Sequence, residues 1–133
     1  MSTWTHVCGA IRFDGMLVKH QPALKMIESQ INHEIPTGTE GPLDLNLYYT
    51  GYEEGMSSSM NIATLVVSGD LRDFNNADIV WDWVKDLVQR LKPYILPRQI
   101  ALLVEVEGKG IWLIRDRKDK EYNIIVSIEK IKS

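Results

Sequence analysis

Strict alternation of apolar and polar side chains marks the stretch Leu43-Asp44-Leu45-Asn46-Leu47-Tyr48-Tyr49. Because successive side chains of a strand point to opposite faces of a sheet, this period of two predicts a strand with one buried face. Residues 51–59 then read as a connection. Residues 61–68 predict another strand, the third of the chain, which pairs with the strand at Leu43 to Tyr49 as a hairpin.

The segment before this strand interrupts regular structure. Residues 32–42 contain two prolines and two glycines, and they predict an irregular loop. Further toward the N-terminus, Pro22 suits the first turn of a helix, and Leu24, Ile27 and Ile31 follow at helical spacing. Alternation returns over residues 5–13, which predict the first strand of the chain.

The C-terminal half predicts one long helix and three strands. Asn75 or Asn76 can cap the helix. Its buried stripe is expected at Val80, Val84, Leu87 and Leu91. After the helix, residues 99–107 and 111–115 predict a hairpin, and residues 122–131 predict the last strand.

The predicted order of elements is β-α-β-β-α-β, followed by one or two further strands. Two helices of this length can cover one face of a mixed or antiparallel sheet, which is the ferredoxin-like arrangement of an α+β sandwich. The sequence therefore predicts this fold class, in a single domain that spans residues 1–133. The alternative is another α+β sandwich, in which the C-terminal hairpin changes the strand order.

Composition and charge restrict the classes of function. The chain has 133 residues and a net charge of −3, so it lacks the strongly basic character that general nucleic-acid binding requires. It has one cysteine, no signal peptide and no apolar run long enough to span a membrane. We therefore expect a cytoplasmic protein that binds neither nucleic acid in general nor membranes.

Sequence signatures of catalysis are missing. The chain has no nucleophile elbow, no phosphate-binding glycine-rich loop and no zinc-binding His-Glu-x-x-His motif. Its three histidines lie apart, and one cysteine cannot supply a structural zinc site, so no metal and no cofactor is expected. The remaining enzymatic hypothesis is a small hydrolase that uses His6, Glu40 and Asp70 as acid and base groups.

The segment Gly69-Asp70-Leu71-Arg72-Asp73 offers candidate binding residues between the third strand and the second helix. In a functional interpretation, Arg72 holds an anion and Asp70 accepts hydrogen bonds, with Asp73 beside them. In a structural interpretation, Asp73 favours the N-terminus of the helix and Arg72 braces either acid.

The sheet face turned away from the helices is the second candidate region. The residues expected on it are His6, Cys8, Arg12, Asn46, Tyr48, Thr64, Val66 and Ser68. This mixture of polar and apolar side chains is typical of a surface that a second subunit or a partner covers.

Two non-enzymatic hypotheses follow from these regions. The first is a binding protein, expected to form a homo-oligomer, that engages another protein through the sheet face or its loops. The second is a small-molecule binder, in which the Gly38–Gly41 loop, Arg12 and Arg72 line a pocket for an anionic, nucleotide-like ligand.

Three stretches carry a wider similarity. Residues 4–14 read Trp-Thr-His-Val-Cys-Gly-Ala-Ile-Arg-Phe-Asp, residues 38–43 read Gly-Thr-Glu-Gly-Pro-Leu, and residues 69–74 read Gly-Asp-Leu-Arg-Asp-Phe. In these stretches the chain resembles a group of small uncharacterised proteins encoded by bacteriophages, and the likeness is weakest in the C-terminal third. The resemblance implies the cytoplasm of a bacterial host, and a host-takeover or anti-defence protein that binds a host or phage protein. It implies no catalytic role.

Overall fold

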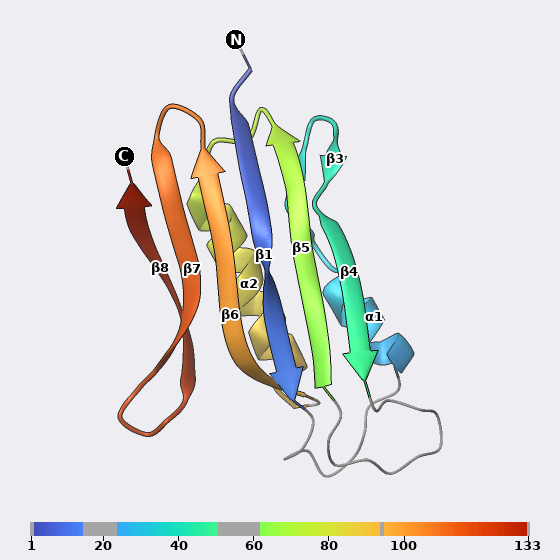
Figure 1. Ribbon diagram of the computed structural model, residues 1–133. Coiled ribbons are helices and arrows are strands. Elements are labelled where there is room, and N and C mark those ends of the chain that lie inside the picture. The colour runs from blue at the N-terminus through green and yellow to red at the C-terminus, as the bar shows by residue number, and fades with distance from the viewer. Residues whose placement is uncertain (1, 15–23, 51–61, 94, 133) are drawn as a thin grey trace.

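The computed structural model describes residues 2–14, 24–50, 62–93 and 95–132. Its elements are β1 (Trp4–Asp14), α1 (Leu24–Ile31), β2 (Thr37–Gly38), β3 (Gly41–Pro42), β4 (Asp44–Thr50), β5 (Ile62–Arg72), α2 (Ala77–Leu91), β6 (Leu96–Val106), β7 (Gly110–Lys118) and β8 (Ile124–Lys132). Six strands form one antiparallel sheet in the spatial order β4-β5-β1-β6-β7-β8, and β2 and β3 pair as a separate two-stranded sheet (Figure 1).

The predicted fold class is wrong. The protein is mostly β, because two helices of 8 and 15 residues accompany a main sheet of six strands. The C-terminal strands β7 and β8 extend that sheet beyond β6, so they are a large part of the fold. The chain is therefore not a ferredoxin-like α+β sandwich. Apart from the short β2 and β3, the order of elements along the chain is the predicted one.

Two predicted boundaries also need correction. The segment 32–42, predicted to be irregular, contains the β2–β3 hairpin. The third strand does not end at residue 68, because β5 continues to Arg72 and includes most of the segment that was expected to connect strand and helix. Pro22 and the predicted connection at 51–59 lie outside the described residues.

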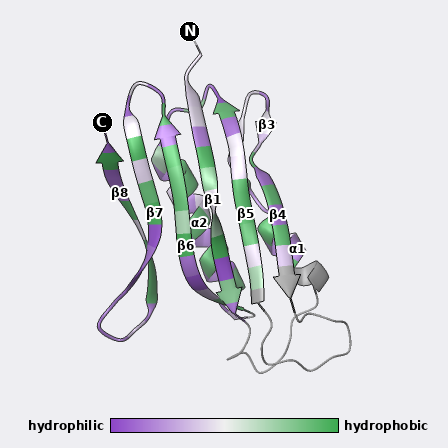
Figure 2. Ribbon diagram, viewed as in Figure 1, coloured by the Kyte–Doolittle hydropathy of each residue, from purple (hydrophilic) through white to green (hydrophobic). Residues whose placement is uncertain are grey.

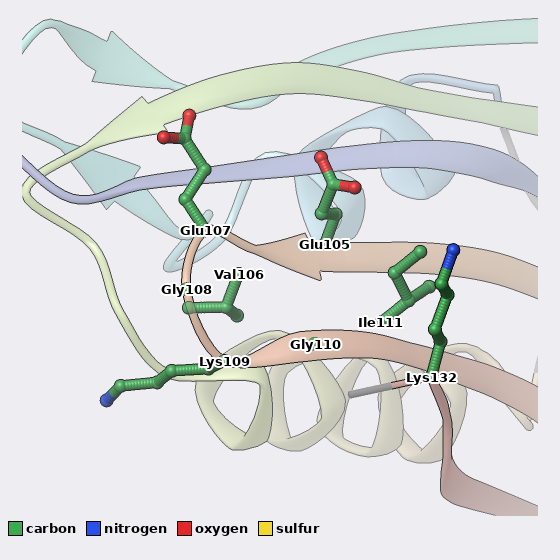
Figure 3. A pocket seen from close by; sticks show the side chains of 8 residues that line it. All are labelled: Glu105, Val106, Glu107, Gly108, Lys109, Gly110, Ile111 and Lys132. Atoms are coloured by element: carbon green, nitrogen blue, oxygen red, sulfur yellow. The ribbon is translucent and has the colours of Figure 1, made fainter.

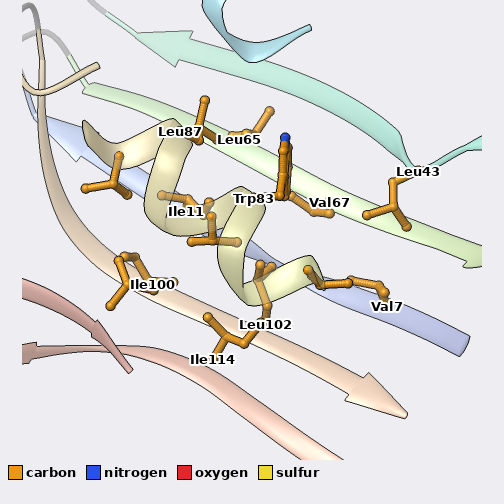
Figure 4. Packing of buried hydrophobic residues seen from close by; sticks show 14 of the residues in the cluster. Val7, Ile11, Leu43, Leu65, Val67, Trp83, Leu87, Ile100, Leu102 and Ile114 are labelled. Carbon is orange, nitrogen blue, oxygen red and sulfur yellow. The ribbon is translucent and has the colours of Figure 1, made fainter. Parts of the chain in front are cut away.

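Both helices lie on the same face of the main sheet, and the buried side chains gather between the two layers (Figures 1 and 4). The largest fully buried side chains are Ile11, Phe13, Leu65, Val67, Leu71, Val80, Val84, Leu87, Leu91, Ile100, Leu102 and Ile114. The described residues share this one hydrophobic core, which is the main source of stability in a sheet-and-helix layer. Along the strands, apolar residues alternate with more polar ones (Figure 2).

Capping and packing fix α2 on the sheet. The predicted cap is confirmed at Asn76, whose side chain accepts a hydrogen bond of 2.8 Å from the Asp78 amide. The predicted buried stripe of the helix is confirmed as well, and Trp83 is buried beside it. Trp81 is partly buried and donates from Nε1 to the Val126 carbonyl at 3.0 Å, so the helix holds the last strand directly.

Close approach of β1 and β6 requires a glycine at the centre of the sheet. Gly9 has a φ of 152°, and a Cβ atom built there would lie 2.0 Å from the Ala101 carbonyl oxygen. Because no side chain fits in that space, β1 and β6 can approach each other this closely only if residue 9 is glycine.

Candidate functional site

The His6 side chain lies between two carboxylates at one end of the helix-free sheet face. β1 places His6 opposite Asp70 of β5, and its Nδ1 lies 2.5 Å from Asp70 Oδ1. Its Nε2 lies 2.8 Å from Oε1 of Glu107, the residue after β6. The Glu107 amide donates to the Trp4 carbonyl at 3.0 Å, which holds this end of β6 against β1. We call His6, Asp70 and Glu107 the His6 cluster.

Both contacts form fully only when the His6 ring carries two protons. A carboxylate accepts hydrogen bonds, whereas a neutral imidazole has one N–H and leaves one ring nitrogen without a proton to donate. The hydrogen bond to Asp70, followed by the bond to Glu107, raises the pKa of His6 against a smaller opposing effect of burial. The His6 side chain is 38% exposed, so water screens the charges and each contact is modest in energy.

A second group of candidate residues meets where the β2–β3 hairpin lies against the end of β5. Arg72 donates from Nη1 to Glu40 Oε1 at 3.4 Å and from Nε to Ser2 Oγ at 3.1 Å. Thr39 donates from Oγ1 to Asp73 Oδ2 at 3.1 Å and from its amide to the Arg72 carbonyl at 3.0 Å. The Arg72 guanidinium is therefore already engaged inside the protein.

Gly38 allows the hairpin to lie this close to β5. A Cβ atom built on Gly38 would lie 2.7 Å from both the backbone nitrogen and the backbone oxygen of Arg72. The sequence predicted that Arg72 braces Asp70 or Asp73. Instead, Arg72 pairs with Glu40, and Asp70 pairs with His6. These contacts favour the structural interpretation of Arg72.

Arg12 and Tyr48 lie at the opposite end of the same sheet face. His6 and Arg12 are six residues apart on β1, which corresponds to about 20 Å along the strand. The register places Arg72 opposite Trp4, so Arg12 and Arg72 are about 27 Å apart along the strands. The anionic-ligand hypothesis required Arg12 and Arg72 to line a common pocket. At this distance they do not.

Several acidic residues near His6 were not predicted from the sequence. A shallow depression beside the cluster is lined by His6, Cys8, Asp44, Asp70, Leu103 and Glu105, among others. Glu105 and Glu107 point to the same side of the β6 end, away from α2 (Figure 3). Their spacing of two is visible in the sequence, but only the register, which places Glu105 opposite His6, brings them to this site.

The hydrolase hypothesis placed His6 beside Asp70 and Glu40. Both His6 ring nitrogens are hydrogen-bonded to carboxylates, those of Asp70 and Glu107, so a substrate would have to displace one of these contacts to exchange a proton with the ring. Glu40, the third residue of the hydrolase hypothesis, pairs with Arg72 instead. Within the described residues, no group of three or more His, Cys, Asp or Glu side chains could hold a metal ion.

Comparison of the chain with protein-family models, with curated proteins and with solved structures gives no match. The resemblance to bacteriophage-encoded proteins therefore stays a prediction. The class that the fold defines is a mostly β protein with a six-stranded antiparallel sheet, which has helices on one face and a mixed polar and apolar surface on the other. In the part of the chain that the structure describes, none of the helices has the length and apolar character that crossing a membrane requires.

Proposed function

We propose that the chain is a non-enzymatic binding protein, and that its binding surface is the helix-free face of the six-stranded sheet. The observation that carries this proposal is the asymmetry of burial across β1. Val7 and Ile11 point to the helices and are at most 3% exposed, whereas Cys8 and Arg12, which alternate with them, are exposed. One face of the sheet is therefore sealed, and the described residues leave the other face uncovered.

The open face has the composition of a contact surface. Tyr48 is 62% exposed and Leu103 is 42% exposed, and both are among the largest exposed apolar side chains in the described residues. The register places small side chains, Ala10 and Ala101, side by side near the middle of the face. Exposed aromatic and aliphatic groups within a polar surround are typical of protein interfaces.

The choice of a protein partner over a small anion rests on the arginines. Arg72 is bonded to Glu40 and Ser2, and Arg12 is too far away to join it around one ligand. The resemblance to bacteriophage-encoded proteins favours a host or phage protein as the partner, and a role in host takeover or anti-defence in a bacterial cytoplasm.

Cys8 provides a direct test, because it is the single cysteine of the chain and lies exposed on the open face. The protein would be labelled at Cys8 with a maleimide photo-crosslinker and irradiated in an extract of cells that make it. A matched control carries the label on α2, in the variant Cys8→Ser with Ile79→Cys, since Ile79 is 48% exposed. We expect a defined adduct with a polypeptide from Cys8 and none from position 79. Absence of an adduct from Cys8, or equal adducts from both positions, would refute the proposal.

A further inference from the structure

The charges on the open face separate along the strand direction. One end carries Asp70, Glu105 and Glu107 around His6, with Asp44 one row further along, opposite Ser68. Arginines follow toward the other end: Arg115 lies in the row of Ala10 and Ala101, and Arg12 and Arg117 lie further along β1 and β7. Each part of the face also carries opposite charges, which are Lys132 and Arg72 at the acidic end and Glu129 and Asp14 on the side of the arginines. The face therefore has an excess of carboxylates at one end and an excess of arginines toward the other.

Three of these charges, Arg12, Asp44 and Glu105, form no ion pair in the described part of the protein, although most other charged groups of the face do. Glu105 lies opposite His6, but the His6 ring is hydrogen-bonded to Asp70 and Glu107 instead. An unpaired arginine at one end and unpaired carboxylates at the other are complementary to each other. A partner surface that carries the same charges in reverse order along the strands is therefore complementary to this face.

A two-fold axis that runs across the strands in the plane of contact produces this reversal. Such an axis, placed between the rows of Cys8 and Ala10, stacks the acidic end of one copy on the arginine end of the other. Arg12 then lies about 10 Å from the axis, and the rotation of about 30° between packed sheets shifts it sideways by about 5 Å. That shift is about one strand spacing, so it moves Arg12 from a position over His6 to one over a neighbour of His6 in the same row. Both neighbours, Asp70 and Glu105, are acidic.

The side chains near this axis allow close packing of two sheets. On the three strands β5, β1 and β6, the central rows consist of Cys8, Ala10, Val66, Ser68, Ala101 and Leu103. The same rows continue over the outer strands with larger and charged side chains, which are Asp44, Asn46, Leu113, Arg115, Ser127 and Glu129. Most side chains on the three central strands are small, so there two faces can approach to the spacing of about 10 Å that is usual for stacked sheets. We infer that the partner of the open face is a second copy of this chain, bound face to face with its strands reversed.

The size of the face sets the expected strength of this dimer. The rows from His6 to Arg12 extend about 20 Å, and the six strands extend about 24 Å, so each copy contributes a footprint of about 500 Å². Specific complexes bury about 800 Å² per partner, so the dimer is expected to be weak and to depend on concentration. This inference rests on the proposed function and names the partner of the same surface.

The test is analytical ultracentrifugation of the purified protein from about 10 μM to about 1 mM, the range in which a weak dimer forms. The wild type is expected to approach twice the monomer mass. Arg12→Glu and Glu105→Arg are each expected to weaken the dimer about tenfold or more, and the double variant to bind more tightly than either single variant.

Lys120→Glu makes the same charge change as Arg12→Glu in the exposed turn before β8 and is expected to have no effect. A bis-maleimide crosslinker should join two copies through Cys8, but not through Ile79→Cys in the Cys8→Ser background.

Specific outcomes overturn the inference. A wild type that remains monomeric over the whole range would do so, as would a dimer that Arg12→Glu and Glu105→Arg leave unchanged. Near-ultraviolet circular dichroism of each variant establishes that it is folded, so that a lost dimer is not a lost fold. If the purified protein is monomeric while labelled Cys8 still crosslinks to a different polypeptide, the self-association is wrong and the proposed function stands. If neither happens, both are wrong.

Discussion

Replacement of His6 by glutamine removes the charged centre of the His6 cluster while keeping a polar side chain of similar length. In the wild type, the protonated ring bridges Asp70 and Glu107, which come from β5 and from the end of β6. His6→Gln can retain one neutral hydrogen bond but no charge–charge attraction. The variant should therefore be less stable than the wild type wherever His6 is protonated.

The size of the effect follows from exposure. Asp70 and Glu107 are 65% and 49% exposed, and exposed ion pairs contribute about 0.2 to 1 kcal/mol each. The two pairs together are expected to contribute about 1 kcal/mol to the free energy of unfolding. Because folding raises the pKa of His6, the contribution is fully present below the unfolded-state pKa of about 6.5. It is lost as the pH rises through the folded-state pKa.

Urea unfolding of the wild type and His6→Gln, from about pH 5.5 to about pH 9, measures this difference across the titration of the ring. We expect a gap of about 1 kcal/mol at the acidic end that falls to a few tenths at the alkaline end. His33→Gln is the matched control, because His33 lies 4.0 Å from a single carboxylate, that of Glu34, and should reproduce the wild-type profile. A gap that is independent of pH, or that widens as the pH rises, would refute the assignment of His6 as a bridging cation.

Three further substitutions test other parts of the structure. Leu102→Ala empties a fully buried position in the central sheet and should cost about 2 to 5 kcal/mol in urea unfolding. Gly38→Ala introduces a clash with the Arg72 backbone, so the Thr39 amide should exchange its hydrogen faster while the core strands keep their protection. Asp119→Ala removes the acceptor of two backbone amides in the turn before β8, which hold the pKa of Asp119 below its usual value. The resulting loss of thermal stability should be present at neutral pH and disappear as the pH falls through that lowered pKa.

Local patterns in the sequence predicted the elements and their faces well. Alternation along β1 and β4 predicted which residues face the helices, although Leu45 and Leu47 on β4 are only partly buried, since a period of two is a property of any strand with one buried side. The cap at Asn76 and the stripe of α2 are also local, and both are confirmed. These features need only a residue and its near neighbours.

The fold class and the site depend on contacts between distant segments. The width of the main sheet depends on β7 and β8 continuing past β6, and no local pattern states which strand joins which edge. The same holds for the His6 cluster, where 64 residues separate His6 from Asp70 and 101 residues separate it from Glu107. His6 and Asp70 were selected as candidates for their chemistry, whereas Glu107 required the register of β6 on β1.

Protonation of His6 should affect folding and self-association in opposite directions. Loss of that proton weakens the bridge within one copy, but it changes the summed charge of His6, Asp70 and Glu107 from −1 to −2. Glu105 adds a further negative charge beside the ring, and the Arg12 of a second copy would face this group. The face-to-face dimer should therefore tighten as the pH rises through the His6 pKa, while the free energy of unfolding of the monomer falls. Ultracentrifugation at about pH 6 and about pH 8.5, on either side of the ordinary histidine pKa, measures this, with His6→Gln expected to show no such change. Dimer affinity that decreases over this range would contradict the predicted contact between Arg12 and the acidic end of the face.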